Sequence, residues 1–255
     1  MQRKIQKMKQ KGKEITGICM DEKRFTTILW DNDNTLMDFE YSMHKALKSC
    51  FEAFNLTINE EIIARYEEIN TAYWKRLERG EVTKQQLLDG RFVDLFQELG
   101  YEVDVPSFRE LFQVELGSYY SYLDNSIEIC RKLHGIVKQY IVTNGVLETQ
   151  IKKITAAGFA DLMEEIFISG VIGYEKPRKE FFEYCLDKIE EKDHDKILIV
   201  GDSLTSDIAG GNNAGIRTCW YNPKAKKAGE EYRIDYEIQN LEQIFEVIAY
   251  GTDKG

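Results

Sequence analysis

The sequence predicts an α/β fold in which a Rossmann-like core, built on a parallel sheet, carries an inserted domain of helices. A short apolar run at 25–30 has the composition of a strand. From residue 41 to about residue 121 the apolar residues recur only at helical spacing. After this block, short apolar runs alternate with amphipathic segments, which is typical of a parallel sheet with helices on both faces. Because the first run has no strand near it in sequence, it must pair with the later ones.

Four amphipathic helices account for the inserted block. Each has one apolar stripe with spacings of three and four residues, and no part of the block alternates as a strand would. The stripes therefore predict a helical bundle with a core of its own. They consist of Met43, Ala46, Leu47, Cys50, Phe51 and Phe54; Ile62, Tyr66, Ile69, Tyr73 and Leu77; Leu88, Phe92, Leu95, Phe96 and Leu99; and Phe108, Leu111, Phe112, Leu116 and Tyr119.

Further strands are expected after the helical block. The runs VKQYIVTNG (137–145), EIFISG (165–170), KILIVGDS (196–203) and IRTCWYN (216–222) are apolar and short, and a weaker run lies near Tyr236. The segments between them, such as 178–189, have the spacing of helices. The predicted domains are a core of 24–40 and 118–250, a helical cap of 41–117, a basic N-terminal extension of 1–23 and a tail of 251–255.

Composition argues against several classes of function. The 255 residues carry a formal net charge of −10, whereas binding to nucleic acid depends on clustered Lys and Arg. No apolar stretch approaches the roughly 18 residues that cross a bilayer. The basic segment 1–13 lacks the apolar core of a secretory signal and is expected to be disordered. The five cysteines form no CxxC pair, which indicates reduced thiols in a cytoplasmic protein. The protein is expected to be a monomer or a homodimer.

Side chains able to carry out chemistry stand where the predicted strands end. The carboxyl ends of parallel strands meet at one edge of a sheet, where ligands bind, so we expect these side chains to converge. Each alone is explained as a turn former, a helix cap or a solvated side chain. Several acids at one edge, however, must be compensated, and they form the oxygen-rich cluster that Mg²⁺ prefers. The residues are Asp31, Asp33, Thr143, Asn144, Lys176, Asp202 and Asp207.

The order of these motifs resembles that of the haloacid dehalogenase (HAD) superfamily of phosphohydrolases. DNDNT as a DxDxT motif, a strand-terminal Thr, a Lys-Pro pair and GDSLTSD follow one another within 25–250. The resemblance implies a Mg²⁺-dependent phosphomonoesterase in which Asp31 is the nucleophile and becomes an aspartyl phosphate. Asp33 would protonate the leaving oxygen and then take a proton from water. On an extended chain, side chains two residues apart point to the same side, so both carboxylates could address one phosphate.

The resemblance implies roles for the other motif residues as well. The Thr143 hydroxyl and the Asn144 main-chain N–H would hold phosphoryl oxygens, and Lys176 would place a cation between the phosphate and Asp31. The acid at position 33 favours phosphate esters over halides, because only an alkoxide leaving group needs a proton. Asn34, where the family commonly has Asp or Gly, tolerates unusual backbone angles, and the amides of DNDN are expected to matter less than its acids. The expected Mg²⁺ ligands are Asp31, Asp33 through its main-chain carbonyl, Asp202 and, directly or through water, Asp207.

Three segments carry a narrower resemblance, to bacterial 5'-nucleotidases of the pyrimidine-nucleotide type. They are YEEINTAYWKRLERGEVTKQQLLDGRFVDLF (66–96), DFE after the first motif and YEKPRKEFF around Lys176. This resemblance implies a nucleoside 5'-monophosphate as the small phosphorylated substrate. A sugar-phosphate or phosphoglycolate phosphatase and a phosphomutase remain alternatives with the same motifs. A phosphate-binding module without turnover is a further alternative, although Asp31 and Asp33 are both intact.

The cap is expected to close over the substrate and to contact its leaving group. Aromatic rings stack on bases and Arg contacts polar edges, which favours Tyr73, Trp74, Arg76 and Arg91 as the residues to test. A simpler interpretation makes Tyr73 part of the cap core and leaves the two arginines in solvent.

Overall fold

The structure is a computed structural model of the chain, and it describes residues 23–250. The predicted tail at 251–255, and the predicted N-terminal extension up to residue 22, lie outside the described residues. Within the described part, no helix is both long and apolar enough to span a membrane. The four cysteines described, Cys50, Cys130, Cys185 and Cys219, are buried and free, while Cys19 lies outside.

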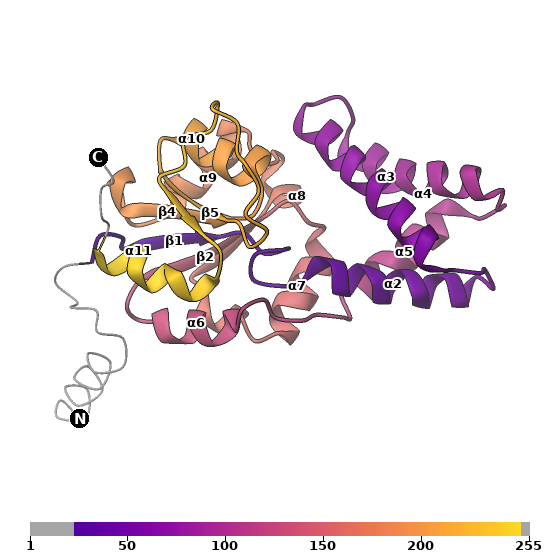
Figure 1. Cartoon of the computed structure of the whole chain (residues 1–255), viewed down its shortest axis with the longest axis horizontal. Helices are drawn as coiled ribbons and strands as arrows, with labels where there is room; N and C mark the ends of the chain where they lie inside the picture. Colours follow the sequence, from indigo (N-terminus) through magenta and orange to yellow (C-terminus); the bar gives the residue numbers. More distant parts are fainter. Residues whose placement is uncertain (1–22, 251–255) are drawn as a thin grey trace.

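A six-stranded sheet forms the centre of the molecule, in the order β3-β2-β1-β4-β5-β6 (Figure 1). All five strand pairs are parallel. The first strand lies between β2 and β4, so the prediction that it joins the later strands is confirmed. The strands are β1 (Thr27–Trp30), β2 (Lys138–Thr143), β3 (Glu165–Ile168), β4 (Ile197–Gly201), β5 (Arg217–Tyr221) and β6 (Tyr236–Ile238).

Helices cover both faces of this sheet, as predicted (Figure 1). Along β1, Ile28 and Trp30 face one apolar core and Leu29 faces the other, which follows from the two-residue period of a strand. The first core takes residues from α6 (Ser126–Leu133), α7 (Leu147–Ala156) and α11 (Ile244–Tyr250). The second is closed mainly by α9 (Lys179–Lys188). The short elements are η1 (Ala160–Leu162), α8 (Ser169–Ile172), η2 (His194–Lys196), η3 (Leu204–Ile208), α10 (Ala209–Ala214) and η4 (Leu241–Gln243).

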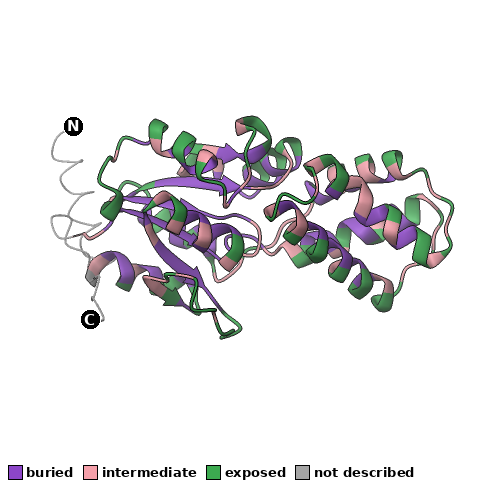
Figure 2. Ribbon diagram, turned by 90° about the horizontal axis from the view of Figure 1, so that it is seen from above, coloured by how far each residue is buried: buried purple, intermediate pink, exposed green. Residues whose placement is uncertain are grey.

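A separate bundle of four helices stands at one end of the sheet (Figures 1 and 2). In it, α2 packs on α5 and α3 packs on α4. Its core is aromatic: Phe92 stacks on Tyr66 at 5.3 Å between ring centroids, and Phe96 meets Phe108 edge to face at 4.8 Å. Most residues of the four predicted stripes are buried here. The helices are α2 (Phe39–Ala53), α3 (Glu60–Glu78), α4 (Lys84–Leu99) and α5 (Val105–Leu116).

Side-chain caps set where three of these helices begin. The Asp38 carboxylate accepts from the N–H of Tyr41 at the start of α2, and Asn59 caps α3 in the same way. Thr83 and Gln86 form a reciprocal capping box at the start of α4. The last of these caps makes Lys84 the first residue of α4.

Candidate active site

A cavity of about 380 Å³ lies between the carboxyl ends of the strands and the helical bundle. Its floor contains all seven residues that the sequence predicts for the site. These residues converge at one edge of the sheet, as expected. The roof of the cavity comes from α2 and α3. The floor residues are Asp31, Asp33, Thr143, Asn144, Lys176, Asp202 and Asp207, and the roof includes Phe39, Met43, Glu67, Asn70, Thr71, Trp74, Lys75 and Glu78.

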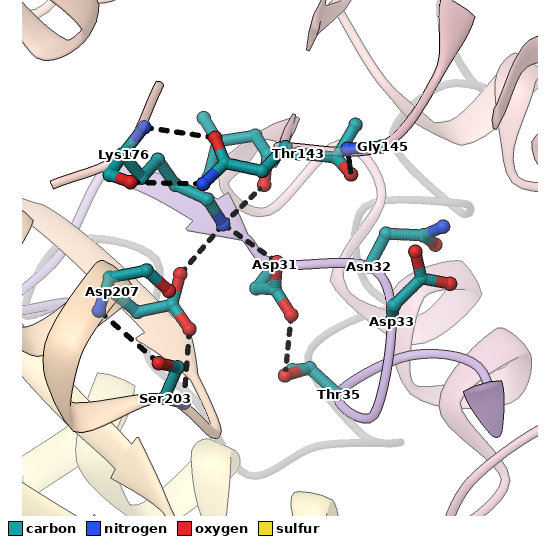
Figure 3. A network of polar contacts seen from close by, with 12 residues as sticks. Asp31, Asn32, Asp33, Thr35, Thr143, Gly145, Lys176, Ser203 and Asp207 are labelled. Atoms are coloured by element: carbon teal, nitrogen blue, oxygen red, sulfur yellow. Dashed lines mark hydrogen bonds and ion pairs between the residues drawn. The ribbon is translucent and has the colours of Figure 1, made fainter. Parts of the chain in front are cut away.

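Lys176 stands at the centre of the floor and is almost completely buried (Figure 3). Its Nζ donates to Asp31 Oδ1 and to Asp207 Oδ1, both at 2.7 Å, and to the main-chain oxygen of Val142 at 2.9 Å. The Asn144 carboxamide holds the main chain of Lys176 from the neighbouring strand end, with both hydrogen bonds at 2.9 Å. The ammonium is therefore held by Val142 of β2 and by Asp31, the residue after β1.

Asp31 is held at the end of β1 by contacts on both sides. Its Oδ2 accepts from the Thr35 hydroxyl at 3.1 Å, and that hydroxyl accepts in turn from the N–H of Asp202, also at 3.1 Å. The main-chain N–H of Asp31 donates to Val200 of β4 at 2.9 Å. Thr35, the last residue of the DNDNT motif, thus connects the Asp31 carboxylate to the main chain of Asp202.

Three acids of the floor form a set of oxygen ligands. One carboxylate oxygen from each of Asp31, Asp202 and Asp207 lies within 4.8 Å of the others. Hard cations such as Mg²⁺ prefer such oxygens, so the donor set fits this metal. Asp207 is already engaged, because its Oδ1 accepts from Lys176 and its Oδ2 accepts from the N–H of Ser203 at 3.1 Å. A side chain at Gly201 would overlap the Asp207 carboxylate, which explains the glycine.

Burial and mutual repulsion dominate the electrostatics of this cluster. Burial, together with the charge of Asp207, raises the pKa of Asp31 to about 7, against the lowering effect of Lys176. Burial and the charges of Asp31 and Asp207 likewise raise the pKa of Asp202 well above its ordinary value. Burial alone would lower the pKa of Lys176, but the charges of Asp207 and Asp31 outweigh it and raise that pKa. The site thus holds one permanent cation among acids that favour a second positive charge.

Asp33 points in a different direction from Asp31 (Figure 3). Its Oδ1 lies 2.7 Å from Nζ of Lys153, a lysine with no exposed surface, and its Oδ2 accepts from Gln150 Nε2 at 2.7 Å. Gln150 also accepts from the Asn32 amide at 2.5 Å. Asp33 therefore borders the cavity while both of its oxygens are bound to α7.

The backbone explains this direction. Strand β1 ends at Trp30, and the carbonyl of Asn32 then accepts from the N–H groups of Leu36 at 3.0 Å and Met37 at 2.9 Å. Asn34 adopts a φ of 63°, the unusual conformation that asparagine tolerates. Because the chain turns here, the alternation of an extended strand does not apply to Asp33. The amides of DNDN are structural elements of this turn and of its link to α7.

The cap contributes residues that the sequence did not single out. Nζ of Lys84 donates to the main-chain oxygen of Asn144 and lies 4.7 Å from the ring centroid of Trp74. Glu78 at the end of α3 hydrogen-bonds to Thr205 of η3, and burial raises its pKa. These two contacts hold the bundle against the sheet. No local pattern marks Lys84, Glu78, Gln150 or Lys153, because each has helical spacing that also suits a solvated residue.

Of the four cap residues favoured for contact with a leaving group, the structure places only Trp74 on the cavity. Tyr73 is packed in the cap core and its hydroxyl donates to Asp94 at 2.9 Å. Arg76 lies over the Tyr73 ring, beside a different cavity. Arg91 is buried, which excludes the interpretation that leaves it in solvent.

Comparisons with known proteins agree with this architecture. The model of the haloacid dehalogenase-like hydrolases matches residues 25–215. The HAD-hydrolase YfnB of Bacillus subtilis is 35% identical over 226 residues, which cover 89% of this chain and 96% of YfnB. Pyrimidine 5'-nucleotidase PynA of Streptococcus pneumoniae is 30% identical over 225 residues, or 87% of this chain and 94% of PynA.

Solved structures support the same conclusion. A crystal structure of YfnB bound to magnesium superposes with a TM-score of 0.85, covering 88% of this chain and 98% of that chain at 35% identity. Like the family match, the superposition spans both the sheet and the helical bundle. This chain therefore belongs to the haloacid dehalogenase-like hydrolases.

Proposed function

We propose that the protein is a Mg²⁺-dependent phosphomonoesterase that acts through an aspartyl phosphate, with nucleoside 5'-monophosphates as its substrates. The observation that carries the proposal is the pairing of Asp31 with the buried Lys176 on the floor of a cavity that also holds Thr143 and Asp33. Similarity to PynA over most of both chains supports a nucleotide as the ester.

In the proposed reaction, an Asp31 oxygen attacks phosphorus and the bond from phosphorus to the leaving oxygen breaks. Asp33 donates a proton to that oxygen, for which it has to turn from α7 towards the cavity. Water then attacks the aspartyl phosphate while Asp33 accepts its proton, and inorganic phosphate leaves. Lys176 stays beside Asp31 throughout and neutralises charge on the phosphoryl oxygens.

The side chains of Asp31 and Asp202 and the main-chain oxygen of Asp33 are the groups that would hold Mg²⁺. When bound, Mg²⁺ supplies positive charge for the phosphoryl group that is transferred. Asp207 supports this set from its ion pair with Lys176.

The substrate is tested by a panel of nucleoside monophosphates and sugar phosphates assayed with Mg²⁺ for phosphate release. We expect kcat/KM to be highest for the nucleotides. A preference for a sugar phosphate would mean that the protein is a sugar-phosphate phosphatase and not a nucleotidase. No phosphate release from any ester would contradict phosphatase activity itself.

Mg²⁺ should stabilise the protein more strongly as pH rises. The folded-state pKa of Asp31 is about 7 against an ordinary value of 3.8. Its contribution to the stability of the metal-free protein is therefore complete below about pH 4 and is lost as pH rises through about 7. Because Mg²⁺ binds the ionised acids, we expect its effect on Tm to be larger at about pH 8 than at about pH 5. Thermal unfolding with Mg²⁺ and with a chelator measures this, and equal shifts at both pH values would contradict it.

Replacing Lys153 by Met should reduce turnover without unfolding the protein. Lys153 sets the resting position of Asp33 at the cavity wall, from which Asp33 turns to exchange its proton. Without Lys153 the proton donor has no charged partner to fix that starting orientation. We expect kcat for a nucleotide to fall by about tenfold, part of the full effect of a general acid. p-Nitrophenyl phosphate, whose leaving group needs no proton, should be affected less. Lys152→Met, on the neighbouring exposed lysine, is the matched control, and an equal loss in both variants would exclude a specific role for Lys153.

A further inference from the structure

Arg91 lies in the aromatic core of the cap and has only 2% of its surface exposed. Its guanidinium carbon is 5.0 Å from the ring centroid of Phe92 and 5.3 Å from that of Phe112. Its Nη1 donates to Oδ1 of Asn70 at 2.8 Å. Among the described residues, its Nε and Nη2 have no hydrogen-bond partner. A buried guanidinium with a single hydrogen bond is unfavourable for stability, so the hydrogen bond to Asn70 calls for an explanation.

Asn70 stands between this arginine and the active-site cavity. It belongs to α3, is 6% exposed and lines the roof of the cavity. Because its Oδ1 accepts from Arg91, the orientation of its carboxamide is determined, and Nδ2 is the atom left to donate. Within residues 23–250, no protein acceptor is found for that Nδ2. The structure therefore presents an N–H donor at the cavity, on a residue that is otherwise largely buried.

The surroundings of Asn70 indicate what this donor would meet. Trp74 follows one helical turn later and lines the same roof, which adds an aromatic wall. Phosphate held on the floor by Lys176 would direct the leaving group of an ester towards this roof. A leaving group that is a planar ring could pack against Trp74, and an acceptor oxygen in the plane of that ring could accept from Asn70 Nδ2.

We propose that Asn70, held in place by Arg91, recognises the leaving group by donating a hydrogen bond to a ring carbonyl oxygen, with Trp74 as the adjoining wall. This inference rests on the proposed function and narrows its substrates to nucleotides whose base carries such a carbonyl. Pyrimidine nucleoside 5'-monophosphates have one in every base. Arg91 acts only through Asn70 and is a positioning residue.

Asn70→Asp is the decisive variant, because it keeps the shape and the acceptor for Arg91 but replaces the donor by an acceptor. We expect Tm to be unchanged or higher, since the arginine gains an ionic partner. We expect kcat/KM for uridine 5'-monophosphate to fall at least about tenfold, as for a site that loses a hydrogen bond to its substrate. For ribose 5-phosphate, which has no base, kcat/KM should change less than about threefold. The ratio of kcat/KM for uridine 5'-monophosphate to that for ribose 5-phosphate should therefore fall.

Arg91→Met tests the positioning role. The variant removes the donor that orients Asn70, so we expect KM for uridine 5'-monophosphate to rise several-fold while kcat changes less. Arg91→Lys should restore part of the loss. Combined with Asn70→Asp, Arg91→Met should add little to the loss of selectivity, because both act on one hydrogen bond. Arg76→Met, on the same helix as Asn70 but beside a different cavity, is the control and should leave the ratio of kcat/KM between the two substrates unchanged.

The outcomes separate this inference from the proposed function. Wild-type protein that hydrolyses uridine 5'-monophosphate, together with an Asn70→Asp variant of unchanged selectivity, would overturn the role of Asn70 and leave the nucleotidase intact. Wild-type protein that hydrolyses ribose 5-phosphate but no nucleotide would overturn both. A selectivity loss in Asn70→Asp without loss of Tm supports the inference. A purely structural role would instead lower Tm and reduce kcat/KM for both substrates together.

Discussion

Asp31→Asn is expected to abolish turnover and to leave the protein folded. The amide has the size of the carboxylate but cannot attack phosphorus, so kcat should fall by at least about 10⁴-fold, as for the loss of a covalent nucleophile. The fold should persist because Asp31 is one of three acids within 4.8 Å of one another, and removing its charge relieves repulsion. Lys176 keeps its second partner, Asp207, at 2.7 Å.

Two measurements check this expectation. Phosphate release with Mg²⁺ gives the loss of turnover, and circular dichroism with thermal unfolding gives the fold and Tm. Mass spectrometry of wild-type protein quenched in acid should detect a phosphoryl adduct on the peptide that contains Asp31. A variant with wild-type turnover would remove Asp31 from the mechanism, and an adduct on another residue would reassign the nucleophile.

Lys176→Met is expected to have the largest combined effect on stability and activity. The change leaves Asp207, which is completely buried, without its cation, and breaking a buried pair in this way costs about 3–5 kcal/mol. Turnover should fall as well, because the charge beside the Asp31 carboxylate and the phosphoryl oxygens is gone. Mg²⁺ should offset part of the loss of stability, since it gives the acids another counter-charge.

A double-mutant cycle isolates the ion pair. Asp207→Asn removes the carboxylate that Lys176→Met leaves unpaired, so the double variant should be more stable than the sum of the single effects predicts. Urea unfolding of the four proteins gives the coupling free energy. Strict additivity would show that Lys176 and Asp207 do not stabilise each other, in conflict with their distance of 2.7 Å.

The main strands and the four cap helices were predictable because each has a local signature. The runs that became β2 and β4 have apolar centres, at 140–142 and 197–200, and the stripe that became α3 recurs at spacings of three and four. The candidate floor was predictable for a related reason. Residues after parallel strands are carried to one edge whatever lies between them, so Asp31, Thr143 and Asp202 had to approach one another.

The partners of those residues were not predictable. Asp33 binds Gln150 and Lys153, which follow it by 117 and 120 residues on a helix with ordinary amphipathic spacing. Arg91 and Asn70 lie on two different helices of the cap, and their hydrogen bond depends on how α3 and α4 pack. No spacing rule relates such pairs, because packing angles and side-chain rotamers decide them.

The sequence by itself determined the strands, the helical insert, the family and the seven polar residues of the floor, because periodicity and motif order are properties of short segments. Only the tertiary structure decided that Asp33 is held by α7, that Lys176 joins Asp31 to Asp207, and that Asn70 rather than Arg91 borders the cavity. These are contacts between segments distant along the chain. Their existence depends on the three-dimensional packing of elements, which no local pattern encodes.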